Sequence, residues 1–421
     1  MYDNQNISNK IKSWLIILLW IGIIPATYRG YGNQFVLTYL GISMFLLLFI
    51  EKGQITINFT ASFWKIFIGY YFLISIINIP NGYTDPKEIM NLVIKYIFIP
   101  VIIWLCMSND YTQNKKTLVY IRNLLVFSAI YGLIEEVLKY NYLTKFILIN
   151  DYTNEINTIN NVGYQVTSIF MHYNYYGIAL ILCWILLCTI PFKSKIYNYL
   201  FRILIIEQLI ICQSRISWIA MLFIVIVQFL EKNKAKVSRN IIVSLAAIAL
   251  IVIFLPKLLN IITNSIFGKR FANIFQYGML NGSVGQRLGT LENWPTYFQN
   301  NIINGVFGTG YQSIGNAFLN KYSYFSGYST ADNQLTIYLV ETGIIGTTIA
   351  IFAMGNLLVK KIGKNSNLNL AFRLLILLII IESTTLDVIS NNIILILFYV
   401  LSITFLKESE LFEIKKEKHE N

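Results

Sequence analysis

The sequence contains few charged residues, few cysteines and almost no histidine. Only 13% of its 421 residues are charged, whereas 56% are hydrophobic, and the mean hydropathy is +0.57. A soluble chain of this length does not have such a composition. The four cysteines, Cys106, Cys183, Cys188 and Cys212, lie in apolar runs without a CxxC spacing. This pattern excludes a disulfide framework and a zinc site built on cysteine pairs.

Histidine is scarcer still, because His172 is the only one outside the C-terminal tail. Metal sites need several ligands, and no second His or Cys accompanies His172. The sequence therefore predicts no metal and no other cofactor. The net charge of +12 is interpreted as a signal of membrane topology, so nucleic acid is not an expected partner.

Long apolar runs are the dominant feature of the sequence. They measure about 17–25 residues, the length needed to cross a hydrocarbon core of roughly 30 Å. The sequence thus predicts an all-α polytopic integral membrane protein with about twelve transmembrane helices. The expected spans are 13–26, 34–50, 63–79, 89–107, 117–138, 166–190, 199–212, 216–230, 241–256, 334–359, 370–387 and 393–406.

Lysine and arginine gather at alternate connections between these spans, for example at 10–12, 115–116, 193–195, 232–239 and 360–364. The positive-inside rule then places both termini in the cytoplasm. The first span is short and follows two lysines, as in a signal peptide. Residues 25–28 lack a small-residue cleavage pattern, so a retained helix is expected.

The same topology leaves one large extracytoplasmic loop, residues 257–333, where ordinary connections have about 4–6 residues. We therefore expect transmembrane helices over 1–256, a catalytic loop over 257–333, three more transmembrane helices over 334–406 and a cytoplasmic tail over 407–421. Short helices are predicted within the loop at 258–267, 285–293 (stopped by Pro295) and 311–321.

An ordered set of polar motifs occupies the second half of the chain. Residues 168–177 read SIFMHYNYYG, and QSRISW follows at 213–218. Gln286-Arg287, Trp294 and the segment IINGVFGTG at 302–310 lie in the loop. The loop closes with TADNQL at 330–335, and ETGIIG follows at 341–346.

This order of motifs resembles the O-antigen ligase and polymerase superfamily. The resemblance covers roughly 168–346, and tyrosine replaces the proline of the family's His-Pro-Asn turn at position 173. It implies a GT-C-like architecture in the bacterial cytoplasmic membrane, with the active site on the outer face. The implied reaction is a metal-independent glycosyl transfer from an undecaprenyl-diphosphate-linked glycan, with an inverted product. A chain-length regulator and a flippase are possible partners of such an enzyme, besides membrane lipid.

Arg215 and Arg287 would bind the lipid diphosphate, the leaving group. Arginine presents a planar fork that grips two phosphate oxygens at once. The alternative for an arginine at a membrane interface is a snorkelling anchor. His172 is a candidate acid or base, or else a polar residue that orients its loop. Asn174, Asn333, Trp294 and Glu341 are expected to support the site, with Glu341 in a structural pair whose partner the sequence does not identify.

Asp332 distinguishes this chain within the resemblance. In the ligases, the residue before the Asn of this motif is typically histidine, so Asp332-Asn333 looks more like the polymerases that join repeat units. The carboxylate would act as base or orient the acceptor, and Glu292 is a further candidate. The alternative is an N-cap role for Asp332 at the start of the tenth helix.

Two other functions compete with a polymerase. One is a ligase that transfers the finished glycan to another acceptor. The other is a transporter or flippase, which usually shows two related halves with broken helices. This sequence shows no internal repeat, and its hydrophilic residues are concentrated in one loop.

Overall fold

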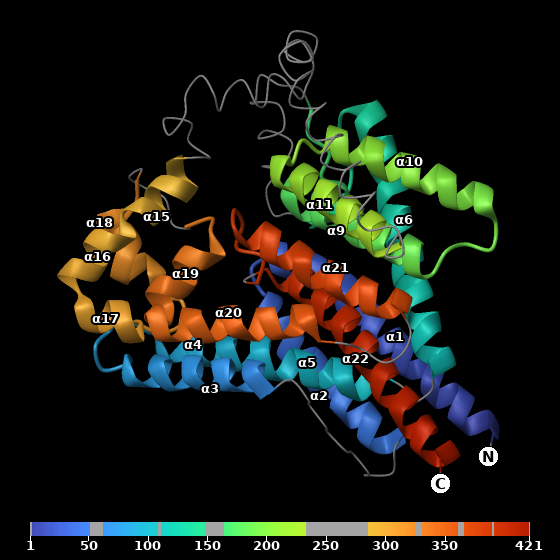
Figure 1. Ribbon diagram of the computed structural model, residues 1–421, viewed down its shortest axis with the longest axis horizontal. Helices are drawn as coiled ribbons and strands as arrows, with labels where there is room; N and C mark the ends of the chain where they lie inside the picture. Colours follow the sequence, from blue (N-terminus) through green and yellow to red (C-terminus); the bar gives the residue numbers. More distant parts are fainter. Residues whose placement is uncertain are drawn as a thin grey trace. The chain divides into compact units, whose positions relative to one another are not determined.

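The computed structural model describes residues 2–50, 62–107, 111–147, 164–232, 285–324, 331–360, 366–389 and 391–420. Every regular element in these ranges is a helix (Figure 1). The chain divides into two compact units, each of which is considered by itself. Unit 1 comprises Met1–Leu124, Lys145–Ile149 and Gly285–Asn421, and unit 2 comprises Leu125–Thr144 and Asn150–Val284.

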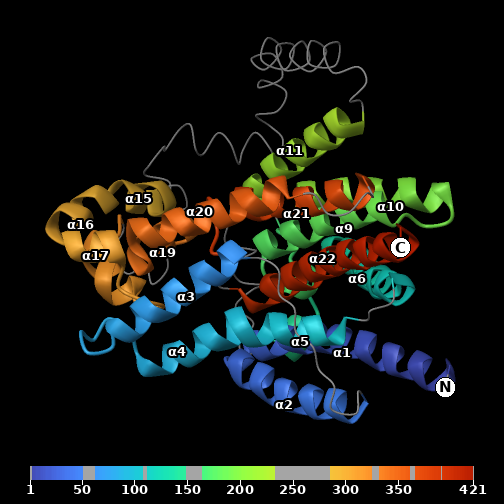
Figure 2. The same cartoon turned by 60° about the horizontal axis from the view of Figure 1, so that its bottom comes forward.

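Unit 1 combines the first helices of the chain with the last ones (Figure 1, blue and cyan with orange and red). Helix α20 packs along α3, and α22 packs against α1, α5 and α21 (Figure 2). Its helices are α1 (Tyr2–Tyr28), α2 (Gly32–Ile50), α3 (Ser62–Ile77), α4 (Pro86–Val93), η1 (Ile94–Phe98), α5 (Ile99–Cys106), α7 (Thr144–Ile147), η5 (Gly285–Gly289), α15 (Thr290–Glu292), α16 (Trp294–Asn300), α17 (Ile302–Phe307), η6 (Gly315–Leu319), α18 (Asn320–Tyr322), α19 (Gln334–Glu341), α20 (Gly343–Val359), α21 (Ser366–Ser383) and α22 (Asn392–Glu420).

Unit 2 is smaller. Helix α6 (Tyr111–Leu138) begins in unit 1 and continues into unit 2, where α9 packs between α10 and α11. The other helices among the described residues of unit 2 are η2 (Ser168–Phe170), α9 (Tyr173–Thr189), α10 (Lys195–Ile211) and α11 (Arg215–Lys232).

Several of these helices have the length and composition of membrane spans. Among the described residues, three helical stretches are long and apolar enough to cross a membrane: 10–28, 86–106 and 114–138. Shorter apolar helices cover 64–77, 173–189, 343–359 and 392–406. These helices indicate a membrane protein. Of the expected spans, 241–256 lies outside the described residues, and each of the others overlaps a helix.

Two expected spans differ from the structure. The sixth was expected from residue 166, but α9 begins at Tyr173 because Ser168 and Met171 have left-handed backbone, with φ of 51° and 56°. The tenth was expected as one helix over 334–359. The structure breaks it into α19 and α20 at Thr342, and Gly343 has a φ of +65°. A left-handed residue interrupts an α-helix, and glycine adopts this conformation most easily.

The helices expected in the loop are partly present. The range 258–267 lies outside the described residues. The helix expected over 285–293 is found as η5 and α15, which ends at Glu292. Pro295 lies in the first turn of α16, where its missing N–H is harmless. The helix expected over 311–321 begins later, with η6 and α18.

Candidate active site

In unit 2, the start of α11 lies beside the start of α9. The Ser214 hydroxyl donates to Asn174 Oδ1 at 2.8 Å and lies 2.9 Å from the Ser217 hydroxyl. A Cβ at Gly177 would collide with Ser217, so glycine is required for the two helices to approach this closely. Arg215 is the first residue of α11, and this packing therefore brings it near Asn174.

His172 immediately precedes α9 and is partly buried. Its ring lies 4.9 Å from that of Tyr173 and 4.8 Å from that of Tyr175, measured between centroids. Arg215 is also partly buried. The structure thus gathers His172, Asn174 and Arg215 at the adjoining starts of two helices.

The loop before His172 is held by a residue to which the sequence assigns no role. Glu135 of α6 is buried, and its carboxylate accepts hydrogen bonds from the backbone N–H of Thr167 at 2.9 Å and of Ser168 at 2.7 Å. The Tyr164 hydroxyl also donates to it, at 3.0 Å. From the turn after α6, the Asn141 amide donates to the Ser168 carbonyl at 2.8 Å. A charge near the end of an apolar span was the only signal in the sequence, and it did not identify these partners.

We predict that Glu135→Ala will lower both thermal stability and enzymatic activity. Each buried N–H left without an acceptor costs about 1–3 kcal/mol, so the turn leading to His172 loses its position. Glu135→Gln should recover part of the activity, because one amide oxygen can still accept. The thermal midpoint and product yield of the purified protein would measure both effects. The matched control is Glu136→Gln, since Glu136 pairs with Glu207 instead. Unchanged activity in Glu135→Ala would contradict this positioning role.

In unit 1, the described part of the loop folds around its own apolar cluster. Tyr297 and Phe318 meet edge to face, with ring centroids 5.3 Å apart, and Trp294 packs against the cluster from its edge. Burial raises the pKa of the Tyr297 hydroxyl, so this phenol stays protonated and is a packing residue and not a base. The buried members are Tyr297, Ile314, Phe318, Leu319, Ala331, Ile337 and Val340.

Arg287 belongs to η5, a π-helical turn at the beginning of this substructure, and is partly buried. Such turns are rare in proteins overall, but those that occur are often found at functional sites. Glu292 follows five residues later with an exposed side chain. Asn293 then ties this stretch to the cluster, because its amide donates to the Tyr322 carbonyl at 2.8 Å.

Asn333, and not Asp332, caps α19. Asn333 Oδ1 accepts from the backbone N–H of Leu335 at 2.9 Å and of Thr336 at 3.4 Å. Asp332 precedes the cap with a φ of +48°, and its side chain is partly buried. The N-cap role that the sequence offered for Asp332 is therefore performed by Asn333.

The segment that contains Gly308 and Gly310 packs directly against the break between α19 and α20. The N–H of Gly310 donates to the Glu341 carbonyl at 2.8 Å, and that of Thr309 donates to the Val340 carbonyl at 3.0 Å. Added Cβ atoms at Gly308 and Gly343 would collide with the backbone of the facing segment. Only glycine allows two backbones to approach this closely, which gives a structural reason for both sequence motifs.

Glu341 has its partner on α3. The Tyr71 hydroxyl donates to Glu341 Oε2 in the buried interior. Lys95 of η1 is buried nearby, with its ammonium 5.8 Å from the centre of the Tyr311 ring, and the charges of Glu341 and Asp387 act on it. The sequence contains these charged residues but does not show that they lie close enough to influence one another. Buried charges of this kind are normally compensated by partners.

Across the described residues, no group of three or more His, Cys, Asp or Glu side chains is arranged to hold a metal ion. The candidate residues of unit 2 carry guanidinium, amide and imidazole groups, and those of unit 1 carry guanidinium, carboxylate and amide groups. Groups of these kinds can bind an anion and move a proton.

Comparison with known proteins gives one result. The model of the O-antigen ligase family matches residues 200–351, while a search of curated proteins finds no match to the chain. The matched segment contains Arg215, Arg287, Glu292, Trp294, Asp332, Asn333 and Glu341. It begins after His172 and Asn174. Residues 200–351 therefore match the O-antigen ligase domain, and this match supports the O-antigen ligase/polymerase superfamily.

Proposed function

We propose that the protein is a polysaccharide polymerase that joins undecaprenyl-diphosphate-linked repeat units on the outer face of the bacterial cytoplasmic membrane. The superfamily assignment supports a glycosyltransferase that uses lipid-linked glycans. The observation that carries the choice of a polymerase is Asp332, directly before the capping Asn333, where the ligases typically have histidine. The product would be an O-antigen, a capsule or an exopolysaccharide.

The reaction proposed is a single displacement. The acceptor hydroxyl oxygen attacks the anomeric carbon of the donor, the bond from that carbon to the diphosphate oxygen breaks, and the hydroxyl proton passes to a base. The glycosyl group moves to the acceptor with inversion, and the diphosphate leaves with the bonding electron pair. Negative charge accumulates on the leaving group and needs fixed positive partners.

Arg215 and Arg287 are the proposed partners of the diphosphate. Each is only partly buried, so part of its side chain remains accessible to a ligand. Each also lies close in the chain to a tertiary contact: Ser214, just before α11, bonds to Asn174, and Asn293, four residues after the end of η5, bonds to Tyr322. Fixed guanidinium groups stabilise the developing charge without reorganisation, so the proposal requires no metal.

Asp332 is the first candidate for the base. It immediately precedes Asn333, which caps the start of α19, and its backbone is left-handed. His172 and Glu292 are the next candidates. His172 packs against tyrosine rings in unit 2, whereas the side chain of Glu292 is exposed.

A ligase is the second candidate function. The name of the matching family, O-antigen ligase, favours it directly. A ligase would use the same donor and the same arginines but would transfer the glycan to a different lipid or protein. The two functions therefore differ only in the acceptor.

Reconstitution with one substrate separates them. The purified protein should convert lipid-linked repeat units alone into a ladder whose steps equal one repeat unit, in the presence of a chelator. Electrophoresis of the released glycan would show the ladder. A ligase would give no ladder and would transfer glycan only after its separate acceptor is added. Absence of transfer under both conditions would contradict the assignment as a glycosyltransferase.

A further inference from the structure

Segment 307–311 of the loop, which follows α17, is bonded to the end of α3 and to the connection between α3 and α4 (Figure 1). The Asn78 amide donates to the Gly308 carbonyl at 3.3 Å, and the Thr84 hydroxyl donates to the Thr309 carbonyl at 3.1 Å. Asn78 and Thr84 belong to the connection, and both are buried. A segment outside the helices therefore finds partners for its carbonyls on the first half of the chain.

Ser75 of α3 provides the third bond. Its Oγ accepts from the N–H of Tyr311 at 3.0 Å, while its own hydrogen is donated to the Tyr71 carbonyl one turn earlier, at 2.6 Å. The rings of Tyr71 and Tyr311 meet edge to face, with centroids 5.6 Å apart. Between these contacts, a Cβ at Gly310 would collide with the Thr84 hydroxyl. The segment thus lies against α3 and the connection as closely as a glycine permits.

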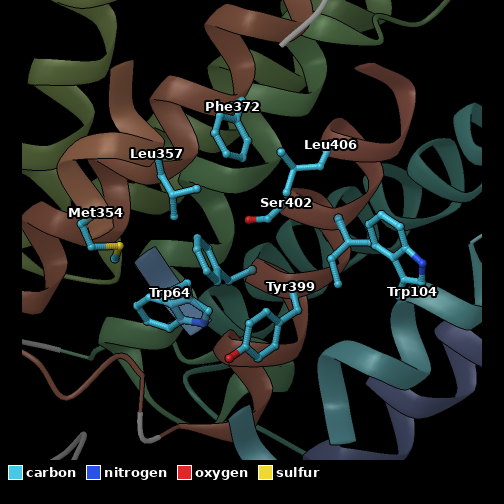
Figure 3. A pocket seen from close by; sticks show the side chains of 10 residues that line it. Trp64, Trp104, Met354, Leu357, Phe372, Tyr399, Ser402 and Leu406 are labelled. Carbon is cyan, nitrogen blue, oxygen red and sulfur yellow. The ribbon is translucent and has the colours of Figure 1, made fainter. Parts of the chain in front are cut away.

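Helix α3 is anchored at its other end in the interior of unit 1. Trp64, near its start, lines a cavity of about 40 Å³ together with Met354 of α20 and Tyr399 of α22 (Figure 3). The connection is fixed as well, because its last residue, Asp85, caps the first turn of α4. Segment 307–311 is therefore bonded to a support that other contacts hold in place.

The same segment is also bonded to α19. The N–H groups of Thr309 and Gly310 donate to the carbonyls of the last two residues of that helix, at 3.0 and 2.8 Å. Helix α19 has only 8 residues, a length of about 12 Å. A shift of its end therefore also shifts its start, where Asn333 caps the helix directly after Asp332. The position of the candidate base thus depends on a chain of contacts that begins at α3.

We propose that Ser75, Asn78 and Thr84 are positioning residues of the glycosyl transfer. They hold segment 307–311 and, through it, the start of α19, so that the reacting groups meet in the required geometry. The inference rests on the proposed function. The three residues precede the range 200–351 that matches the family, so that match does not include them. They act through the backbone of the segment and not through the substrate.

Replacing Thr84 by valine tests this role, because valine keeps the shape of the side chain and removes the donor to Thr309. The kcat with lipid-linked repeat units should fall about 100-fold, the scale expected when a reacting group is displaced by about 1 Å. Thr84→Ser keeps the hydroxyl and should retain a kcat near that of the wild type. Equal losses in the two variants would overturn the inference.

Thr404→Val is the matched control. Thr404 is also buried, but its hydroxyl donates to the Val400 carbonyl within α22, at 2.6 Å. The same chemical change there should leave kcat unchanged. A loss in Thr404→Val as large as that in Thr84→Val would show a general effect of the substitution and overturn the inference.

A double-mutant cycle shows whether Thr84 acts through the candidate base. Thr84→Val combined with Asp332→Asn should give a kcat no lower than that of Asp332→Asn alone, because displacement cannot further harm a base that has lost its charge. Two losses that multiply would indicate an independent effect and overturn the inference. A slow Thr84→Val beside a normal Asp332→Asn would keep the positioning role and refute Asp332 as the base.

Amide exchange tests the contacts without any enzymatic activity. Ser75→Ala removes the acceptor of the Tyr311 N–H, so deuterium uptake in peptides that contain Tyr311 should be about tenfold faster, the scale for loss of one hydrogen bond. Ser402→Ala, the same change in α22, should leave this uptake unchanged. Unchanged uptake in Ser75→Ala, or a wild-type kcat in Thr84→Val, would overturn the inference. A wild-type protein that transfers no glycan would instead refute the proposed function, and uptake in Ser75→Ala would still show whether these contacts hold the segment.

Discussion

Replacing Arg215 or Arg287 by lysine is expected to reduce polymer yield by about 100-fold or more, the usual scale when one fixed donor to a developing anion is lost. Lysine keeps the positive charge but is a point charge, and it cannot make the two parallel hydrogen bonds of a guanidinium. Abundance and membrane insertion should remain normal. Product formation by the purified variants, measured per mole of protein, would give the effect.

Arg202→Lys is the matched control for this experiment. Arg202 lies on α10 in unit 2, with its guanidinium 5.4 Å from the centre of the Trp184 ring. The same chemical change there should leave polymer yield unchanged, because lysine can also lie over an aromatic ring. Wild-type chain lengths from both Arg215→Lys and Arg287→Lys would remove the arginines from the proposed diphosphate site.

Helix positions follow from the sequence because they depend on local hydropathy. The runs over 34–50 and 216–230 coincide with α2 and α11 within two residues, and the run over 117–138 ends where α6 ends, although α6 begins earlier, at Tyr111. The break between α19 and α20 does not follow from hydropathy, since both halves are apolar. It exists because the backbone of Gly308 packs against the carbonyl of Glu341, more than 30 residues away in the chain. Such a contact leaves only a glycine as its trace in the sequence.

The candidate site likewise contains residues that the sequence identifies and residues that it does not. Motif residues such as Arg215, Arg287 and Asp332 are recognisable because their order resembles a known family. Glu135 and Tyr71 are not recognisable, because their roles depend on partners 32 and 270 positions away, Thr167 and Glu341. Hydrophobic periodicity carries no information about such pairs. The N-cap role considered as an alternative for Asp332 likewise belongs to its neighbour, since Asp and Asn suit that position equally well and only the geometry distinguishes Asp332 from Asn333.

Asn333 provides the control for the substitution of Asp332. Asn333→Asp keeps an oxygen that accepts from Leu335 and Thr336, so α19 should start normally. Asn333→Ala removes the cap and should cost about 1 kcal/mol of stability. The thermal midpoint of each purified variant therefore reports the cap separately from catalysis, and Asp332→Asn should leave this midpoint unchanged.

Asp332→Asn is expected to lower turnover by about 100-fold to 10,000-fold, the range for loss of a general base, while donor binding is largely retained. The substitution keeps the shape of the side chain, and asparagine tolerates the left-handed backbone at this position at least as well as aspartate. The charge is then removed, and one accepting oxygen becomes an amide donor, while the size and backbone preference of the residue are kept. The measurement is kcat and donor KM with lipid-linked repeat units, compared with Asn333→Asp. Near-normal turnover in Asp332→Asn would refute the role as base, and His172 and Glu292 would become the residues to replace next.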